Sequence, residues 1–137
     1  MSNYKCYIIY NNNYSYVGIT NNKIRRLKQH NKIIKGGAKY TTSKNGIWNY
    51  MCYIDGFKCK KDALKFEWAL KHIKVKKNNI NHHRIIKLYD LLKKKYWTSK
   101  SPCSIDYKLT IYWCDITFIP ELYDTLPKYI SHDLDIN

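Results

Sequence analysis

Five side chains in the first half of the sequence are suited to hydrolysing a phosphate ester: Tyr7, Tyr16, Arg26, His30 and Glu67. Arg clamps phosphate and His moves protons, and a spacing of four places Arg26 and His30 on one helix face. The set contains no Ser or Cys nucleophile beside a base, so it fits metal-assisted attack by water. Taken singly, Arg and His are more often surface residues and Tyr is more often packing, so the prediction depends on all five together.

Glu67 is the most unusual of these residues, because it is one of two Glu in the chain and lies in an apolar helix. On a helical wheel of residues 63–71 it falls in the middle of a broad packed arc, with only Lys65 and Ala69 clearly outside. A carboxylate there is costly unless it is paired or holds a cation. The alternatives are a buried ion pair with a Lys or Arg of the first helix and a metal site, and the neighbouring candidates favour the metal.

The elements that must position these residues follow from the pattern of apolar residues and turn formers. Glycine tolerates the left-handed turn at a helix end, so Gly36-Gly37 is expected to end the first helix, which Asn21 or Asn22 caps. The expected elements are strands over Lys5–Tyr10, Tyr14–Thr20 and Ile47–Ile54, helices over Asn22–Lys35, Asp62–Lys74 and His83–Tyr96, a linker over Lys74–Asn81 and a short strand within Tyr107–Trp113.

This order predicts an α+β fold: a small three-stranded antiparallel sheet flanked by helices, with a helical C-terminal extension. Tyr7 and Tyr16 should project from the same face of the sheet, because side chains alternate along strands. A register with Tyr7 opposite Tyr16 would leave a two-residue Asn11-Asn12 loop, which suits a type I′ turn.

The charge is unevenly distributed. The chain has a net charge of +15, with 23 Lys and Arg against 4 acids in residues 1–100 and 2 against 6 in residues 101–137. A basic body points to a polyanion, either nucleic acid or an anionic membrane, although a Lys-rich compositional bias would look the same.

No apolar run approaches the ~18 residues that span a bilayer, and the polar N-terminus is unlike a signal peptide, so the protein is expected inside a cell, in the nucleus or cytoplasm. Five scattered cysteines without a Cys-x-x-Cys pair are expected to be reduced thiols.

Four short segments, in this order, resemble the signatures of the GIY-YIG nuclease family. They are Cys6-Tyr7-Ile8, Tyr16-Val17-Gly18, Arg25 to Asn31 and Lys65 to His72. Within the family the chain is most similar to the nuclease subunit of the eukaryotic structure-specific (flap and Holliday-junction) endonuclease. The residues that carry this closer likeness are Gly36-Gly37-Ala38 with Thr41, and Gly56-Phe57 ahead of Ala63-Leu64. The resemblance covers residues 4–73.

The resemblance implies a role for each of the five residues. Tyr7 would accept a proton from water or help to do so, Tyr16 would position water and phosphate, and Arg26 would stabilise the pentavalent phosphate. His30 would assist proton transfer or bind phosphate. Glu67 would be the only protein ligand of one Mg²⁺ or Mn²⁺ ion, with waters completing the octahedron. Whether Tyr7 or His30 is the general base stays open, because an unperturbed Tyr has a pKa of about 10.

The resemblance also implies a nuclease domain over residues 1–77, with residues 78–137 packed on it as a helical and aromatic extension. Two departures matter. Lys5-Cys6-Tyr7 stands where the family has Gly-Ile-Tyr. Beyond residue 100 the Cys and His residues are Cys103, Cys114 and His132, which are too few zinc ligands for the RING-like domain of this branch of the family. Neither zinc nor the usual scaffold subunit is therefore expected, whereas a homodimer is compatible with the sequence. The length and the Lys- and Asn-rich composition fit a viral or mobile-element version.

The implied function is a metal-dependent endonuclease for branched DNA (flaps, forks and Holliday junctions) in recombination, repair or replication. The alternatives are a non-catalytic nucleic-acid-binding module on the same scaffold and a membrane-surface protein, and the intact set of five residues favours the enzyme. Basic residues expected to contact DNA phosphates without reading bases are Arg25, Lys28, Lys39, Arg84, Lys87, Lys93, Lys94 and Lys95. Those of the third helix would form a platform beside the active site that holds a second duplex arm.

Overall fold

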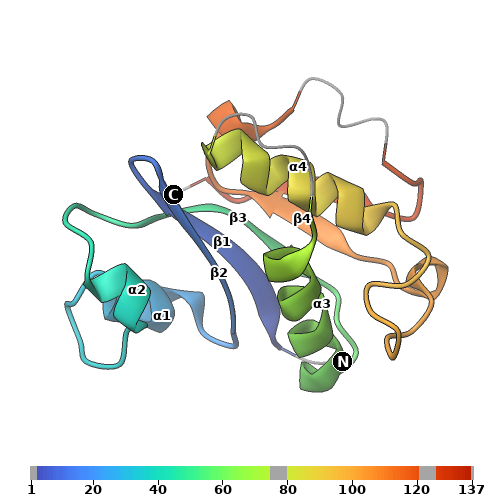
Figure 1. Cartoon of the computed structure of the whole chain (residues 1–137), viewed down its shortest axis with the longest axis horizontal. Helices are drawn as coiled ribbons and strands as arrows, with labels where there is room; N and C mark the ends of the chain where they lie inside the picture. Colours follow the sequence, from blue (N-terminus) through green and yellow to red (C-terminus); the bar gives the residue numbers. More distant parts are fainter. Residues whose placement is uncertain (1–2, 75–79, 121–125, 137) are drawn as a thin grey trace.

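A five-stranded sheet forms the centre of the computed structural model, which describes residues 3–74, 80–120 and 126–136 (Figure 1). The strand order is β2-β1-β3-β4-β5. The strands are β1 (Lys5–Asn11), β2 (Tyr14–Thr20), β3 (Asn49–Asp55), β4 (Thr110–Trp113) and β5 (Ser131–Leu134). The helices are α1 (Lys23–His30), α2 (Lys39–Thr42), α3 (Lys60–His72) and α4 (Ile80–Leu92), with 3₁₀ turns η1 (Ser104–Asp106) and η2 (Ile116–Phe118). The predicted α+β class is confirmed.

The prediction of three strands was wrong, because the C-terminal part of the chain adds two. β4 pairs antiparallel with β3, and β5 pairs parallel with β4, so the sheet is mixed. Ile111 and Trp113 of β4 are buried, which explains why this strand joins the sheet. The segment Ser131–Leu134 has no β-branched or aromatic residue, so nothing local predicted β5. The extension is therefore helix and strand, rather than helical.

The β1–β2 hairpin has the predicted shared face but not the predicted register. Tyr7 lies opposite Gly18, and Tyr16 lies opposite Ile9, which shifts the pairing by two residues and leaves Asn12-Asn13 as the loop. Because the shift is even, Tyr7 and Tyr16 still project from one face, as predicted. Only the first loop residue has a positive φ, of 54°, so the loop is not the expected type I′ turn.

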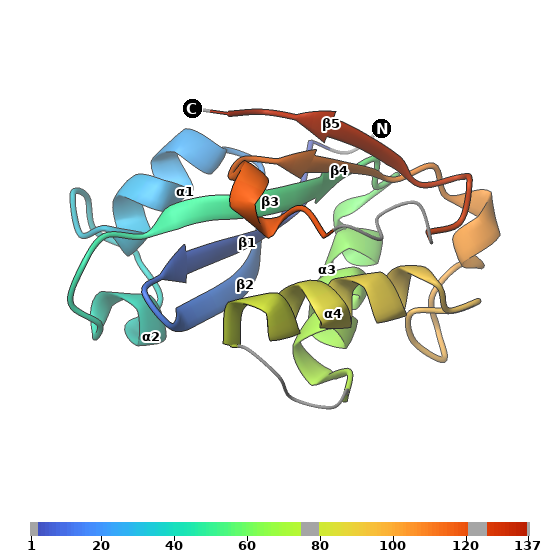
Figure 2. The ribbon, with the colours of Figure 1, turned by 90° about the horizontal axis from the view of Figure 1, so that it is seen from above.

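The two faces of the sheet carry different layers. Cys6 and Ile8 point into the main apolar core with α3 and α4, whereas Tyr7 and Ile9 point to the opposite face. Figure 2 shows α1 on one side of the sheet and α3 and α4 on the other. Alternation along β1 thus places the first candidate tyrosine on the side of α1.

Helix α1 begins where predicted but ends early. The Asn22 side chain accepts a hydrogen bond from the Arg25 amide at 3.0 Å and caps the helix. The helix ends at His30, not at Lys35, so the prediction that Gly36-Gly37 terminates it was wrong. Asn31 instead exchanges two hydrogen bonds with the backbone of Trp48, at 2.7 and 3.0 Å. These tertiary contacts turn the chain away from the helix.

The other two long helices differ from the predictions at their ends only. Helix α3 starts two residues before the expected Asp62, and α4 ends at Leu92 rather than at Tyr96. The linker expected over Lys74–Asn81 lies largely outside the described residues. No helix in the described part of the chain is long and apolar enough to cross a membrane.

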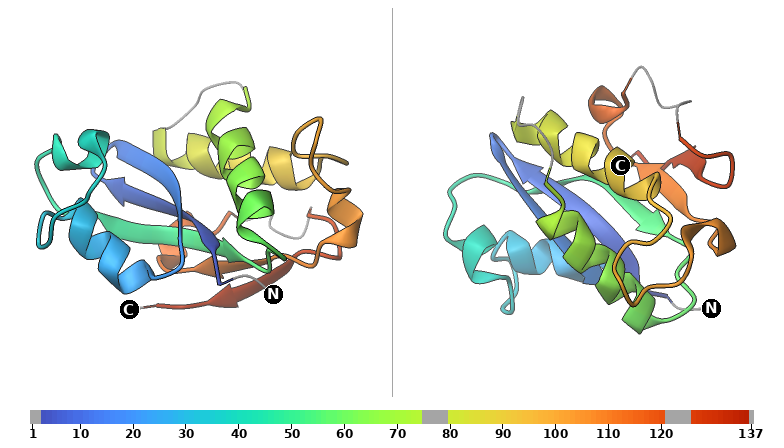
Figure 3. Two further views of the ribbon diagram at one scale, coloured as in Figure 1. Left: turned by 90° about the horizontal axis from the view of Figure 1, so that it is seen from below. Right: turned by 45° about the vertical axis from the view of Figure 1, so that its right-hand side comes forward.

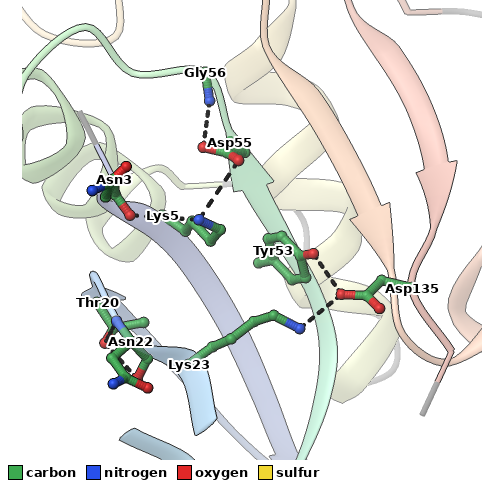
Figure 4. A network of polar contacts seen from close by, with 9 residues as sticks. All are labelled: Asn3, Lys5, Thr20, Asn22, Lys23, Tyr53, Asp55, Gly56 and Asp135. Carbon is green, nitrogen blue, oxygen red and sulfur yellow. Dashed lines mark hydrogen bonds and ion pairs between the residues drawn. The ribbon is translucent and has the colours of Figure 1, made fainter. Parts of the chain in front are cut away.

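A polar network fastens the C-terminal segment to the start of α1 (Figure 4). The Asp135 carboxylate accepts hydrogen bonds from the Lys23 ammonium at 2.7 Å and from the Tyr53 hydroxyl at 2.5 Å. The Lys23 ammonium also lies 4.8 Å from the centre of the Tyr53 ring. The segment after β5 therefore helps to hold the helix that carries Arg26 and His30.

We expect Asp135→Asn to lower the free energy of unfolding by about 1 kcal/mol and the melting temperature by a few degrees, because the pair is partly exposed. The Lys23 ammonium, with the Tyr53 hydroxyl, holds the pKa of Asp135 below its usual 3.8. The contribution is thus complete above that pH and is lost as the pH falls below it. Thermal unfolding followed at neutral and acidic pH checks this, and an unchanged melting temperature at neutral pH would contradict it.

Candidate active site

Three of the five candidate residues meet at the hydroxyl oxygen of Tyr7, which is buried in β1. The oxygen lies 2.7 Å from Nε2 of His30, and Nε of Arg26 donates a hydrogen bond to it at 3.2 Å. Both partners project from α1, and β1 and β2 lie between α1 and α3 (Figure 3). Arg26 and His30, predicted to share a helix face, thus both contact one oxygen atom of β1.

The hydrogen bonds around this oxygen run in one direction. An Arg side chain can only donate, so His30 Nε2 is the one acceptor among the described residues for the Tyr7 hydroxyl hydrogen. His30 then carries its own proton on Nδ1 and donates it to Thr41 Oγ1 at 2.6 Å. The Thr41 hydroxyl in turn donates to the carbonyl of Ala38 at 3.0 Å. The chain therefore presents an unprotonated imidazole nitrogen to Tyr7.

The pKa values of the pair fit this arrangement. Burial raises the pKa of Tyr7 above its usual 10, although the hydrogen bond and charge of Arg26 oppose the change. Burial lowers the pKa of His30 to about 4, and the charge of Arg26 acts in the same direction. At neutral pH Tyr7 is a phenol and His30 is a neutral imidazole that can accept a proton.

We expect the ring of His30 to titrate near pH 4, well below the usual 6.5. Because the unfolded chain would bind this proton near pH 6.5, the stability that depends on His30 should fall as the pH drops from 6.5 to about 4. NMR titration of the imidazole signals measures the pKa, with His30→Gln assigning the resonance. A midpoint near 6.5 for His30 would contradict the arrangement.

A glycine is required opposite Tyr7. A Cβ atom at Gly18 would lie 2.4 Å from the Tyr7 hydroxyl oxygen and 2.6 Å from the ring carbon that bears it. Both distances are far below contact distance, and the backbone at Gly18 needs no positive φ. The glycine of the second signature therefore leaves room for the phenol of the first.

Arg26 is oriented by the loop that follows α1. Its Nη1 donates hydrogen bonds to Oε1 of Gln29 at 2.8 Å and to the carbonyl of Gly36 at 2.9 Å. Gly36 has a φ of 111°, which favours glycine. Within the described residues no carboxylate pairs with Arg26, so its charge is available to an anion.

Tyr16 joins the site through its ring. The ring centre lies 5.3 Å from that of His30, and the ring stacks on Tyr40 at 6.2 Å with an angle of 18°. The ammonium of Lys71 lies 5.1 Å from the same ring. Tyr16 therefore connects the Tyr7–His30 pair to α2 and to helix α3, which carries Glu67.

Glu67 is less buried than the sequence predicted. Its side chain is 17% exposed, its neighbour Trp68 is 57% exposed, and Ala69, expected outside the packed arc, is buried. The prediction that Glu67 lies in the middle of the packed face was wrong, because the C-terminal extension covers the Ala69 side of α3. Its ion partner is Lys71 on the same helix, at 3.6 Å, and not a residue of the first helix. The Glu67 charge nevertheless reaches Tyr7, whose pKa it raises.

The surroundings of Glu67 fit a single-carboxylate cation site. Its carboxylate forms one ion pair in the described part of the chain, the loose one with Lys71, so its oxygens retain lone pairs for a ligand. The described residues contain no group of three or more His, Cys, Asp or Glu side chains that could hold a metal. Hard divalent cations such as Mg²⁺ accept few protein ligands and fill the remaining positions with water and phosphate oxygens.

The basic residues expected to contact DNA fall into three places. Arg25 and Lys28 are exposed on α1, and Lys39 is exposed on α2. Arg84 and Lys87 are partly buried near the middle of α4. The cluster Lys93–Lys95 is exposed beyond the end of that helix, whose residues from Arg84 to Leu92 span roughly 12 Å of rise.

Residue types alone did not reveal three positioning groups: Thr41, which contacts His30, Gln29, which contacts Arg26, and Tyr40, which stacks on Tyr16. The likeness to the family pointed to Thr41 without giving its role. The i,i+4 spacing to Glu67 could have identified Lys71 as its ion partner. No local signal indicated Tyr40, because the chain contains 14 tyrosines.

Known proteins share much of this sequence. Residues 3–81 match the family described as the GIY-YIG catalytic domain. A structure-specific endonuclease subunit SLX1 homolog from Cryptosporidium parvum is 37% identical over 123 residues, which is 87% of this chain and 30% of that protein. The subunit slx1 of Aspergillus terreus is 51% identical over 57 residues (42% and 15%), and that of Schizosaccharomyces japonicus 41% over 73 residues (50% and 26%). The chain thus spans less than a third of each relative's length. Because the family match covers more than half of the chain, the protein belongs to the GIY-YIG catalytic domain family.

Proposed function

We propose that this protein is a metal-dependent endonuclease that hydrolyses phosphodiester bonds in branched DNA. The observation that carries the proposal is the buried Tyr7 hydroxyl, which is held between the Arg26 cation and the unprotonated Nε2 of a neutral imidazole. Three relatives that are named as structure-specific endonuclease subunits support the choice of branched DNA.

The proposed roles follow from the contacts. An attacking water loses its proton to the Tyr7 oxygen as the Tyr7 proton passes to His30 Nε2, so the phenol need not ionise first. Arg26, fixed by Gln29 and Gly36, neutralises charge that develops on the phosphate. Tyr16 positions the water and phosphate beside His30. Glu67 would hold one Mg²⁺ or Mn²⁺ ion, which supplies positive charge to the phosphate when bound.

The non-catalytic alternative is less well supported. The net charge of +15 would serve a nucleic-acid-binding module equally well. Such a module, however, has no use for a buried hydrogen-bonded Tyr7–His30 pair or for a glycine that makes room for the Tyr7 phenol. These two features favour the enzyme.

We extend the proposal to the organisation of the chain. Residues 1–77 form the nuclease domain, and residues 78–137 form an extension that adds β4 and β5 to its sheet. The relatives described above come from cellular eukaryotes, which favours a nuclear location and gives no support to a viral origin.

The proposal is tested with labelled linear duplex, flap, replication-fork and four-way-junction DNA, each incubated with Mg²⁺, Mn²⁺ or excess chelator. We expect cleavage of the branched substrates, with little cleavage of linear duplex and none with chelator. Binding to every substrate without cleavage of any would support the non-catalytic alternative instead.

Gly18→Ala should reduce cleavage at least tenfold while leaving DNA binding unchanged, because the new Cβ would lie 2.4 Å from the Tyr7 hydroxyl oxygen and displace the phenol. Single-turnover rates on a flap substrate measure the effect, and thermal unfolding verifies the fold. Because the substitution acts through Tyr7, it should add little to the effect of Tyr7→Phe when the two are combined. Effects that add fully in the double variant would show another cause.

A further inference from the structure

A pocket of about 600 Å³ lies between the tip of the β1–β2 hairpin and the first half of α4. Its lining includes Tyr14 and Ser15 of β2, Tyr40 of α2, and Arg84 and Lys87 of α4. Figure 2 shows α2, the hairpin and the start of α4 next to one another. The volume is that of a small-ligand site, and the charged residues that line it are basic.

The pocket adjoins the candidate active site. Tyr40 lines the pocket and stacks on Tyr16, whose ring lies 5.3 Å from that of His30. Through Tyr40 the pocket therefore contacts Tyr16, one of the residues proposed to position the phosphate. A ligand in the pocket would lie beside the DNA strand being cut.

Two partly exposed aromatic rings form one side of the pocket. Tyr14 and Tyr40 are each 43% exposed and meet edge to face, with centres 6.4 Å apart. The ammonium of Lys44 lies 4.5 Å from the first ring and 4.9 Å from the second. Aromatic surfaces combined with cations suit a base and its phosphate, since bases stack on such rings whatever their sequence.

The α4 side of the pocket holds two cations, Arg84 and Lys87. Nε of Arg84 donates a hydrogen bond to Ser15 Oγ at 3.2 Å, which fixes the guanidinium against β2. Burial, and then the charge of Arg84, lower the pKa of Lys87. Within the described part of the chain no carboxylate forms an ion pair with either cation. Holding two cations together in a partly desolvated place is costly unless an anion joins them.

We infer that this pocket binds one unpaired nucleotide of the DNA, with its base against Tyr14 and Tyr40 and its phosphate on Arg84 and Lys87. In a duplex both faces of a base are covered by its neighbours, so only an unpaired nucleotide offers a face to the rings. The inference rests on the proposed function for the identity of the ligand as DNA. It gives that function a means of favouring flaps and frayed junctions over intact duplex.

The decisive measurement is binding in excess chelator, where no cleavage occurs. The probes are a short labelled oligo(dT), an abasic oligonucleotide of the same length, and a duplex. Tyr14→Ala should weaken oligo(dT) binding roughly tenfold and leave abasic and duplex binding unchanged, because the variant no longer offers this ring to a base. Tyr14→Phe keeps the ring and should bind normally. Tyr96→Ala is the matched control, since Tyr96 is 48% exposed under the Lys95 ammonium, beyond the other end of α4.

The cations that bind phosphate have a separate signature. The slope of log affinity against log salt is negative, and removing one cation that neutralises a phosphate of a single strand reduces its magnitude by about 0.7. The variant that combines Arg84→Gln with Lys87→Gln should therefore reduce the magnitude of the slope by about 1.4 for both single-stranded probes.

Two results would overturn the inference. One is equal weakening of all three probes by Tyr14→Ala, and the other is an oligo(dT) affinity that is unchanged in both Tyr14→Ala and the Arg84/Lys87 variant. Because chelator is present, these outcomes are independent of cleavage. A chain that binds oligo(dT) as expected but cuts no branched DNA would refute the proposed function alone.

Discussion

Glu67→Gln is expected to abolish metal-dependent cleavage while DNA binding survives. The substitution keeps the size of the side chain, replaces one accepting oxygen with a donating NH₂ group and removes the charge. The described residues contain no group of three or more His, Cys, Asp or Glu side chains that could hold a metal, so the proposed ion would depend mainly on Glu67. Loss of an electrostatic group that acts in the transition state costs about 10²–10³ in rate, and loss of the only protein ligand should cost at least that much.

Two further variants separate a metal site from a merely charged helix. Asp90→Asn removes a carboxylate from the exposed face of α4 and should leave cleavage unchanged. Lys71→Gln removes the ammonium 3.6 Å from Glu67, so it should lower the concentration of Mg²⁺ needed for half-maximal cleavage. Rates are measured on a flap substrate across a metal titration. Comparable cleavage by the Glu67→Gln protein, or cleavage that persists in excess chelator, would refute the metal assignment.

The convergence of Tyr7, Tyr16, Arg26 and His30 could be predicted because it depends on local geometry. Residues four apart share a helix face. Tyr7 and Tyr16 share a sheet face whenever the residue numbers of two paired residues in the hairpin add up to an odd number. A register shift of two residues changes neither relation, so the error in the predicted register left the expected shared face intact.

The features that the sequence did not predict depend on contacts between distant residues. Helix α1 ends at His30 because Asn31 bonds to the Trp48 backbone, 17 residues away. Strand β5 pairs with β4 although Ser131–Leu134 has little strand propensity, and Asp135 then fixes its end to Lys23. A helical wheel treats the surroundings of a helix as uniform, so it could not place Glu67 relative to a C-terminal extension that covers one side of α3.

The hydrogen-bond direction at Tyr7 also bears on how a residue with so high a pKa can take part in proton transfer. Burial favours the phenol over the phenolate, so a free Tyr7 anion would be a scarce base at neutral pH. His30, with a pKa of about 4, stays neutral and holds its unprotonated nitrogen 2.7 Å from the phenol oxygen. Because Tyr7 and His30 share a proton, the pair can accept a proton from water without forming the Tyr7 phenolate. Either residue alone should therefore be a poor substitute for the pair.

Tyr7→Phe should accordingly reduce the cleavage rate by about 10²–10⁴, the range typical of removing an acid–base group. The ring that packs against β2 and Tyr50 is retained, so the protein should fold and bind DNA. His30→Gln should lose a similar amount, and the double variant should lose little more than either single one, because the two residues act as a unit. Single-turnover rates with saturating metal measure all three.

Tyr50→Phe is the matched control for Tyr7→Phe. Tyr50 is also buried, its ring centre lies 5.7 Å from that of Tyr7, and its hydroxyl donates a hydrogen bond to the Lys23 carbonyl at 2.7 Å. Removing that hydroxyl should cost about 1 kcal/mol of stability and leave cleavage nearly unchanged. If both Phe variants lost cleavage equally, the Tyr7 hydroxyl would matter only for packing. A large reduction in Tyr7→Phe alone, at equal stability, would instead assign the effect to its hydrogen bonds with His30 and Arg26.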